Sequence, residues 1–294
     1  MRQALGELRP GSIDPLRGIR RLAVAATAAT LLLIAMGGAV RATDSGLACP
    51  DWPACYGRWV PPADVNQWLE HSHRLWAGVV GLMITALVVW GWRYRRAVPR
   101  LWRLSTVALV LVLVQAGLGA AVVLFHLRAG LVTSHLGMSL VIVACLILVA
   151  LAARSPHQPA IGAAAASHRR WLGHRAAIVA GLVFAQALLG GQATGRGAAY
   201  VYNAVPIWLA DQAWTGHMRE ILHITHRFAG YLVAAAVIGL WVVAERRARR
   251  SGAGADLIRQ LLRLAAVLVV VQVGLGISNV LTQATVWSAI AHLS

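Results

Sequence analysis

Long apolar runs separated by short polar segments dominate the chain. Seven of them approach the about 20 residues that an α-helix needs to cross a bilayer, and an eighth begins near Ala284. The seven cover residues 22–40, 69–92, 104–125, 131–153, 176–191, 221–244 and 264–281. The eighth has only 11 residues before the sequence ends at Ser294, which is about 16 Å of helix. The pattern predicts an all-α polytopic membrane protein whose eighth helix is truncated or unusually short.

The composition agrees with this fold class. Of the 294 residues, 59% are hydrophobic and 13% are charged, which is too apolar for a soluble domain. All 27 basic residues are arginine, and the net charge of +17 would suggest a nucleic-acid partner in a soluble chain. Here the arginines lie between apolar runs, so we interpret them as topology signals and expect no nucleic acid.

The arginines concentrate in the N-terminal tail and in every second loop, at residues 2–21, 93–103, 154–175 and 246–263. Because such loops stay on the cytoplasmic side of a membrane, we expect a multi-pass protein of the cell membrane with a cytoplasmic N-terminus.

The sequence contains an internal repeat. Residues 115–119 (Gln-Ala-Gly-Leu-Gly) recur at 272–276 (Gln-Val-Gly-Leu-Gly), and residues 70–74 (Glu-His-Ser-His-Arg) resemble 223–227 (His-Ile-Thr-His-Arg). Each predicted half has four spans, so both start on the same side of the membrane. We therefore expect two pseudo-symmetric four-helix bundles in parallel, at 1–153 and 170–294, joined by a linker at 154–169.

Four histidines occupy matched positions in these halves. His73, His135, His226 and His292 each lie near the start of a span that enters from the outer side, so we expect them at one depth near the outer face. Ionisable groups inside a membrane usually face the bundle interior, and imidazole is a common axial ligand of heme iron. The pattern predicts one histidine pair and one heme in each half. His223 is an alternative to His226, because it lies one turn earlier on the same helix face.

Three further residues adjoin these histidines. Arg74 and Arg227 directly follow a candidate ligand and are suited to pair with heme propionates, although an arginine that anchors a helix at the interface is the alternative. Glu70 lies three residues before His73, where the second half has His223. This asymmetric carboxylate is a candidate for proton transfer near a heme edge, or simply an acid favoured by the helix dipole.

Cysteines and glycines complete the candidate residues. Cys49 and Cys55 lie in the first outer loop, where an oxidising environment favours a disulfide, with a redox role as an alternative. Cys145 lies in mid-span and is expected to be a small core residue. The paired glycines are expected to let helices approach closely. They are Gly37, Gly38, Gly117, Gly119, Gly190, Gly191, Gly274 and Gly276.

Together, the run at 37–47, the loop cysteines, Glu70-x-x-His73-Arg74, His135-Leu136, His226-Arg227 and His292 resemble heme A synthase. The resemblance implies that the C8 methyl of heme O is oxidised to a formyl group by successive hydroxylation and loss of water.

The resemblance also implies residue roles. His226 and His292 match the ligands of a cofactor heme b, whereas His73 and His135 match the substrate-heme side. Glu70 matches the family's essential acid, and Cys49 with Cys55 match its outer-loop pair. The implied partners are heme O, heme O synthase and a terminal oxidase; the electron donor is not indicated. Val40 departs from the family pattern, which often has threonine there.

Two other classes remain open at this stage. A di-heme membrane cytochrome that carries electrons between quinol and an outer acceptor explains the four histidines but not Glu70. A repeat-built transporter with structural histidines explains the bundles without heme.

Overall fold

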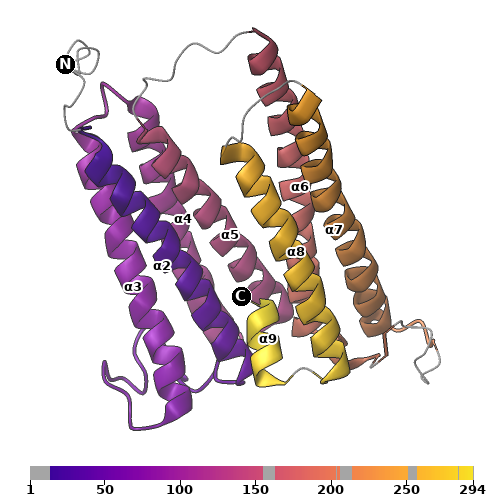
Figure 1. The fold of residues 1–294 in the computed structure, drawn as a ribbon. Coiled ribbons are helices and arrows are strands. Elements are labelled where there is room, and N and C mark those ends of the chain that lie inside the picture. Colours follow the sequence, from indigo (N-terminus) through magenta and orange to yellow (C-terminus); the bar gives the residue numbers. More distant parts are fainter. Residues whose placement is uncertain are drawn as a thin grey trace. The chain divides into compact units, whose positions relative to one another are not determined.

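The computed structural model describes residues 14–154, 163–202, 204–205, 214–250, 257–283 and 285–293. These residues are mostly helical (Figure 1). The helices are α2 (Arg17–Ala42), α3 (Val65–Trp92), α4 (Pro99–Leu124), α5 (Ala129–Ala152), α6 (Ala163–Gly195), the short 3₁₀ helix η1 (Ala198–Tyr200), α7 (Met218–Arg250), α8 (Leu257–Leu281) and α9 (Val286–Leu293).

Seven of these helices, α2 to α8, are long and apolar enough to cross a membrane. This confirms the predicted all-α polytopic class. Several helices extend beyond their apolar runs: α6 begins at Ala163 and α7 continues to Arg250. Apolar residues mark only the part of a helix that meets hydrocarbon. Beyond that part a helix can continue with arginines, because their long side chains reach toward water. Consequently part of the sequence predicted as the linker is helical, and residues 155–162 of that linker lie outside the described residues.

Arginines at these helix ends pack on an aromatic ring. The guanidinium carbons of Arg175 and Arg247 lie 4.0 and 3.9 Å from the centroid of the Trp171 ring. Such cation–π contacts hold long basic side chains in place where the helices leave the apolar region.

The helices form two compact units, α2 to α5 and α6 to α9. In the first unit, α2 and α4 each pack against both α3 and α5, which closes a four-helix bundle. In the second unit, α7 packs between α6 and α8, η1 contacts α6 and α7, and the eight-residue α9 packs on α8.

The best-packed core of the first unit lies at one end of its bundle. Its fully buried side chains come from the first half of α2 and α4 and from the second half of α3 and α5, which share one end because the neighbouring helices alternate in direction. They include Ile19, Ala23, Ile84, Leu87, Leu101, Leu146 and Val149. The predicted core residue Cys145 belongs to this cluster. The opposite end, where α3 and α5 begin, carries His73 and His135.

The second unit repeats this arrangement. Its buried core is formed by Leu172 near the start of α6 and by Leu240 and Ala244 near the end of α7. His226 lies toward the other end of α7. In both units, therefore, the packed end is distant from the candidate histidines.

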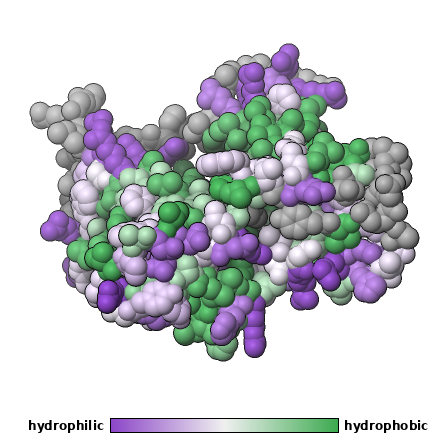
Figure 2. Space-filling model, turned by 90° about the horizontal axis from the view of Figure 1, so that it is seen from below, coloured by the Kyte–Doolittle hydropathy of each residue, from purple (hydrophilic) through white to green (hydrophobic). Residues whose placement is uncertain are grey.

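The α2–α3 loop exposes several aromatic and aliphatic side chains. Trp59, Val60, Tyr56 and Val65 are more than half exposed. Figure 2 views the molecule from the end that carries this loop, and hydrophilic and hydrophobic residues are interspersed on that face. Aromatic side chains among polar groups are typical of the boundary between membrane and water.

Candidate functional site

Each of the four candidate histidines lies against a glycine of the preceding helix. A Cβ atom added to Gly37, Gly119 or Gly276 would lie 3.1, 3.2 or 3.1 Å from Cε1 of the histidine it faces. At Gly190 the corresponding distance is 2.8 Å, closer than real Cβ atoms approach. The facing histidines are His73, His135, His292 and His226, respectively. These glycines therefore make room for imidazole rings.

Sequence reasoning assigned these glycines to helix packing only. The signal that could have found their second role was spacing: 36 residues separate Gly37 from His73 and also Gly190 from His226. Likewise, 16 residues separate Gly119 from His135 and Gly276 from His292.

Glutamines one turn before two of these glycines fix the backbone beside the histidines. Gln115 Nε2 donates to the His135 carbonyl oxygen at 3.0 Å, and Gln186 Nε2 donates to the His226 carbonyl oxygen at 2.8 Å. Gln186 Nε2 also lies 3.0 Å from His226 Nδ1. These contacts tie each histidine-bearing turn to the neighbouring helix.

Several nitrogen atoms of these imidazole rings lack a hydrogen-bond partner in the part of the chain that the structure describes. The Nδ1 atoms of His73, His135 and His292 are buried and have no hydrogen-bond partner among the described residues. All four residues are partly exposed. Since a buried polar atom without a partner destabilises a fold, these imidazoles at matched positions are candidates to hold a cofactor.

Within the second unit, His226 is the histidine whose ring contacts His292. Their ring centroids are 6.3 Å apart, with an angle of 79° between the ring planes. His223 instead contacts Tyr202, and the Nδ1–H group of His223 donates to the Ala198 carbonyl oxygen at 2.7 Å.

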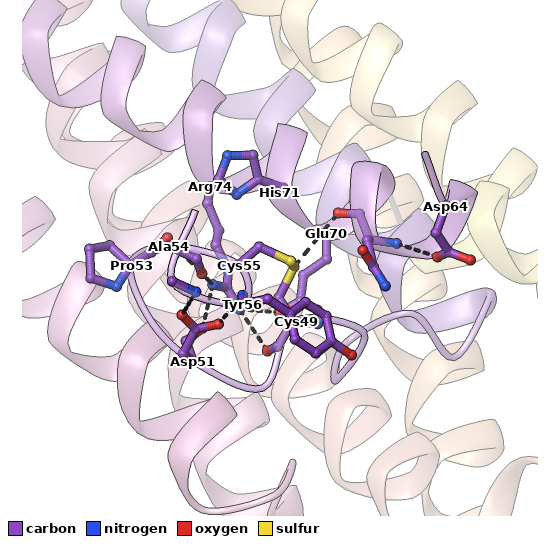
Figure 3. The surroundings of a disulfide bond; sticks show 12 residues. Cys49, Asp51, Pro53, Ala54, Cys55, Tyr56, Asp64, Glu70, His71 and Arg74 are labelled. Atoms are coloured by element: carbon purple, nitrogen blue, oxygen red, sulfur yellow. Dashed lines mark hydrogen bonds and ion pairs between the residues drawn. A yellow bond between two sulfur atoms is a disulfide. The ribbon is translucent and has the colours of Figure 1, made fainter. Parts of the chain in front are cut away.

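In the first unit, Glu70 joins α3 to the loop between α2 and α3 (Figure 3). Glu70 is 4% exposed, and its carboxylate accepts the Cys49 backbone N–H at 2.8 Å through Oε2 and forms an ion pair with Arg74 through Oε1. Both Glu70 oxygens are therefore held in fixed positions beside the loop.

Arg74 points into the same loop (Figure 3). It donates to the carbonyl oxygens of Asp51 and Ala54 at 2.6 and 2.5 Å and to that of Cys49 at 3.2 Å. Cys49 and Cys55 form the expected disulfide and are fully buried. Glu70, Arg74 and the disulfide loop thus form one connected unit.

His71 is fully buried on α3. Its Nε2 lies 2.8 Å from the Trp59 carbonyl oxygen, so this nitrogen carries the donated hydrogen. This contact depends on how the loop folds back, which no spacing rule in the sequence indicates.

Asp51 organises the turn of the disulfide loop. Its carboxylate accepts the backbone N–H groups of Tyr56 and Gly57 at 2.6 and 2.7 Å. The hydrogen bond from Gly57 is the main reason that the pKa of Asp51 lies below its usual value of 3.8, although desolvation opposes it.

We expect acid to loosen this loop. Because the folded-state pKa of Asp51 is depressed, its stabilising effect is complete above the unfolded value of 3.8 and is lost as the pH falls through the folded value. Reduction of the disulfide by a phosphine should therefore accelerate several-fold more below pH 4 in the native chain than in Asp51→Asn. Equal acceleration in both proteins would contradict this role.

The fold and site define a polytopic membrane protein built from two helical units. Each unit has two histidines that lie against a glycine of the preceding helix. The chain belongs to the COX15-CtaA family of cytochrome oxidase assembly proteins, whose family model matches residues 20–294.

Named relatives agree with this membership. The chain is 27% identical over 288 residues to a heme A synthase of Shouchella clausii, covering 94% of this chain and 91% of that protein. It is 28% identical over 305 residues to a heme A synthase of Shewanella oneidensis, covering 90% and 88% of the two chains. A heme A synthase of Lysinibacillus sphaericus is 37% identical over 137 residues, covering 46% of this chain and 45% of that protein.

Proposed function

We propose that this protein is a heme A synthase that oxidises the C8 methyl of heme O to a formyl group. The observation that carries the proposal is the repeated glycine–histidine pair, two in each unit, in a chain that belongs to this family. We assign heme O to the first unit and a cofactor heme b to the second.

The second unit fits a heme held by His226 and His292. Their ring centroids lie 6.3 Å apart, so both imidazoles could hold one heme iron. Among the described residues, no three His, Cys, Asp or Glu side chains gather as a metal site, so the remaining ligands would come from a porphyrin. When bound, heme b supplies electron transfer.

In the first unit, we assign His73 and His135 to the iron of heme O. Glu70 is the acid–base residue, because it is a buried carboxylate one turn from His73. The Cys49 N–H group and Arg74 hold its oxygens, so it can hold or transfer a proton at a defined position. A di-heme electron carrier would have no need for this asymmetric carboxylate.

We further propose that the N-terminus is cytoplasmic and that both histidine pairs lie toward the outer face of the cell membrane. The arginine-rich segments support this orientation through the positive-inside rule. Heme O synthase and a terminal oxidase are the partners that would supply the substrate and receive the product.

Pigment analysis tests the proposed activity. The chain is expressed in cells that make heme O but lack heme A, and the extracted hemes are separated and identified. We expect heme A to appear with the chain and to be absent from cells that carry the empty vector. Heme O and heme B alone, from membranes that contain the folded protein, would contradict the proposal.

Gly190→Ala should reduce the heme b content of the purified protein at least fivefold. The added Cβ would lie 2.8 Å from His226 Cε1, so the imidazole must move away from the position that Gln186 and the glycine define. Absorbance at the Soret band per protein measures the effect.

Gly181→Ala is the matched control, since nothing lies within 4 Å of a Cβ atom at that position of the same helix. Equal heme content in the two variants would show that the close approach at Gly190 does not position the ligand.

A further inference from the structure

The two arginines that follow matched histidines have different surroundings. In the first unit, both terminal nitrogens of Arg74 are occupied by loop carbonyls and by Glu70. In the second unit, Arg227 Nη2 donates to the Ala204 carbonyl oxygen at 2.9 Å. Its Nη1 atom is buried and has no hydrogen-bond partner within the described part of the chain.

Among the described residues, no carboxylate pairs with Arg227 as Glu70 pairs with Arg74. The position that corresponds to Glu70 is His223, which is 5% exposed. Because a carbonyl oxygen only accepts, His223 donates its Nδ1–H to Ala198, and its buried Nε2 has no partner among the described residues. His223 and Arg227 are four residues apart and therefore share a helix face.

The nearest acid on the same helix is engaged elsewhere. Glu220 accepts the backbone N–H groups of Thr215 and Gly216, each at 2.9 Å, and the Thr215 hydroxyl at 2.6 Å. A buried guanidinium without a counter-charge is strongly unfavourable. An anion at the place that Glu70 occupies in the first unit would supply the partner that Arg227 Nη1 lacks among the described residues.

We propose that Arg227 Nη1 binds a propionate carboxylate of the heme held by His226 and His292, and that His223 Nε2 shares a proton with that carboxylate. This inference rests on the proposed function. It assigns propionate binding to Arg227 and reserves Arg74 for Glu70 and the disulfide loop. The ligand's own acid would thus take the place beside Arg227 that Glu70 takes beside Arg74.

Heme with blocked propionates tests the proposal. The full chain, purified without heme, is titrated with iron protoporphyrin IX or with its dimethyl ester, and the Soret absorbance gives each dissociation constant. We expect the native chain to bind the free acid at least 10-fold more tightly than the ester. Arg227→Gln should lose about 10-fold in affinity for the free acid and keep its affinity for the ester.

His223→Glu is a second variant with a distinct expectation. A glutamate there would pair with Arg227 as Glu70 pairs with Arg74, compete with the propionate, and abolish the preference for the free acid. Arg219→Gln is the matched control, because Arg219 is exposed near the start of the same helix. It should behave like the native chain.

The outcomes separate the two proposals. A native chain that binds neither heme overturns the proposed function. A native chain that binds both forms equally, or an Arg227→Gln variant that retains the preference for the free acid, overturns the propionate assignment alone. Unchanged affinity for the ester also shows that each variant is folded.

Discussion

Glu70→Gln is expected to lower heme A formation at least 100-fold while leaving heme b bound to the second unit. General acid–base groups typically contribute about 10²- to 10⁴-fold to a rate. Glutamine retains the shape and an oxygen that can accept the Cys49 N–H, but it cannot exchange a proton. Extracted heme A per cell measures the activity, and the low-spin heme spectrum of the purified protein measures cofactor binding.

A loss of activity could also arise from the loop, because the uncharged glutamine side chain would leave Arg74 without its counter-charge. The double variant Glu70→Gln, Arg74→Gln separates the two causes by removing both charges. If Glu70 acts in the chemistry, the double variant stays inactive; recovery of heme A would assign the residue a structural role only. Glu245→Gln is the control, since Glu245 also pairs with an arginine, Arg249, but does so on α7 rather than on α3.

Replacing single histidines should give opposite results in the two units. His226→Ala should reduce the low-spin heme of the purified protein to less than a tenth, because it removes one of the two histidines that we propose hold this heme. His73→Ala should retain that heme yet form no heme A. Reduced-minus-oxidised spectra and pigment extraction give the two measurements. A loss of the resident heme in His73→Ala, with His226→Ala unaffected, would reverse the assignment of the units.

The sequence predicted the features that repeat or that follow from apolar periodicity. Seven spans follow from runs of apolar residues, and the disulfide follows from two cysteines in a loop predicted to lie outside the membrane. The choice of His226 over His223 rested on internal symmetry, and the structure places the His226 ring against His292.

Features that depend on loop folding could not be read from spacing. Arg74 was interpreted only as a propionate or interface residue, whereas it contacts four loop carbonyls and Glu70. These contacts require the chain between α2 and α3 to fold back over α3, which no helical period describes. The same reason applies to His71 and Trp59, whose contact joins a helix to an irregular segment.

The separation between the densely packed ends and the histidine ends suggests a route to redesign. Residues that hold the helices together, such as Ile84 and Leu146, lie far along their helices from the imidazoles. Side chains around the proposed heme sites could therefore be exchanged for larger or more polar ones with little effect on the packing of the helices. A scaffold of this kind should accept synthetic metalloporphyrins whose peripheral groups differ from those of natural hemes.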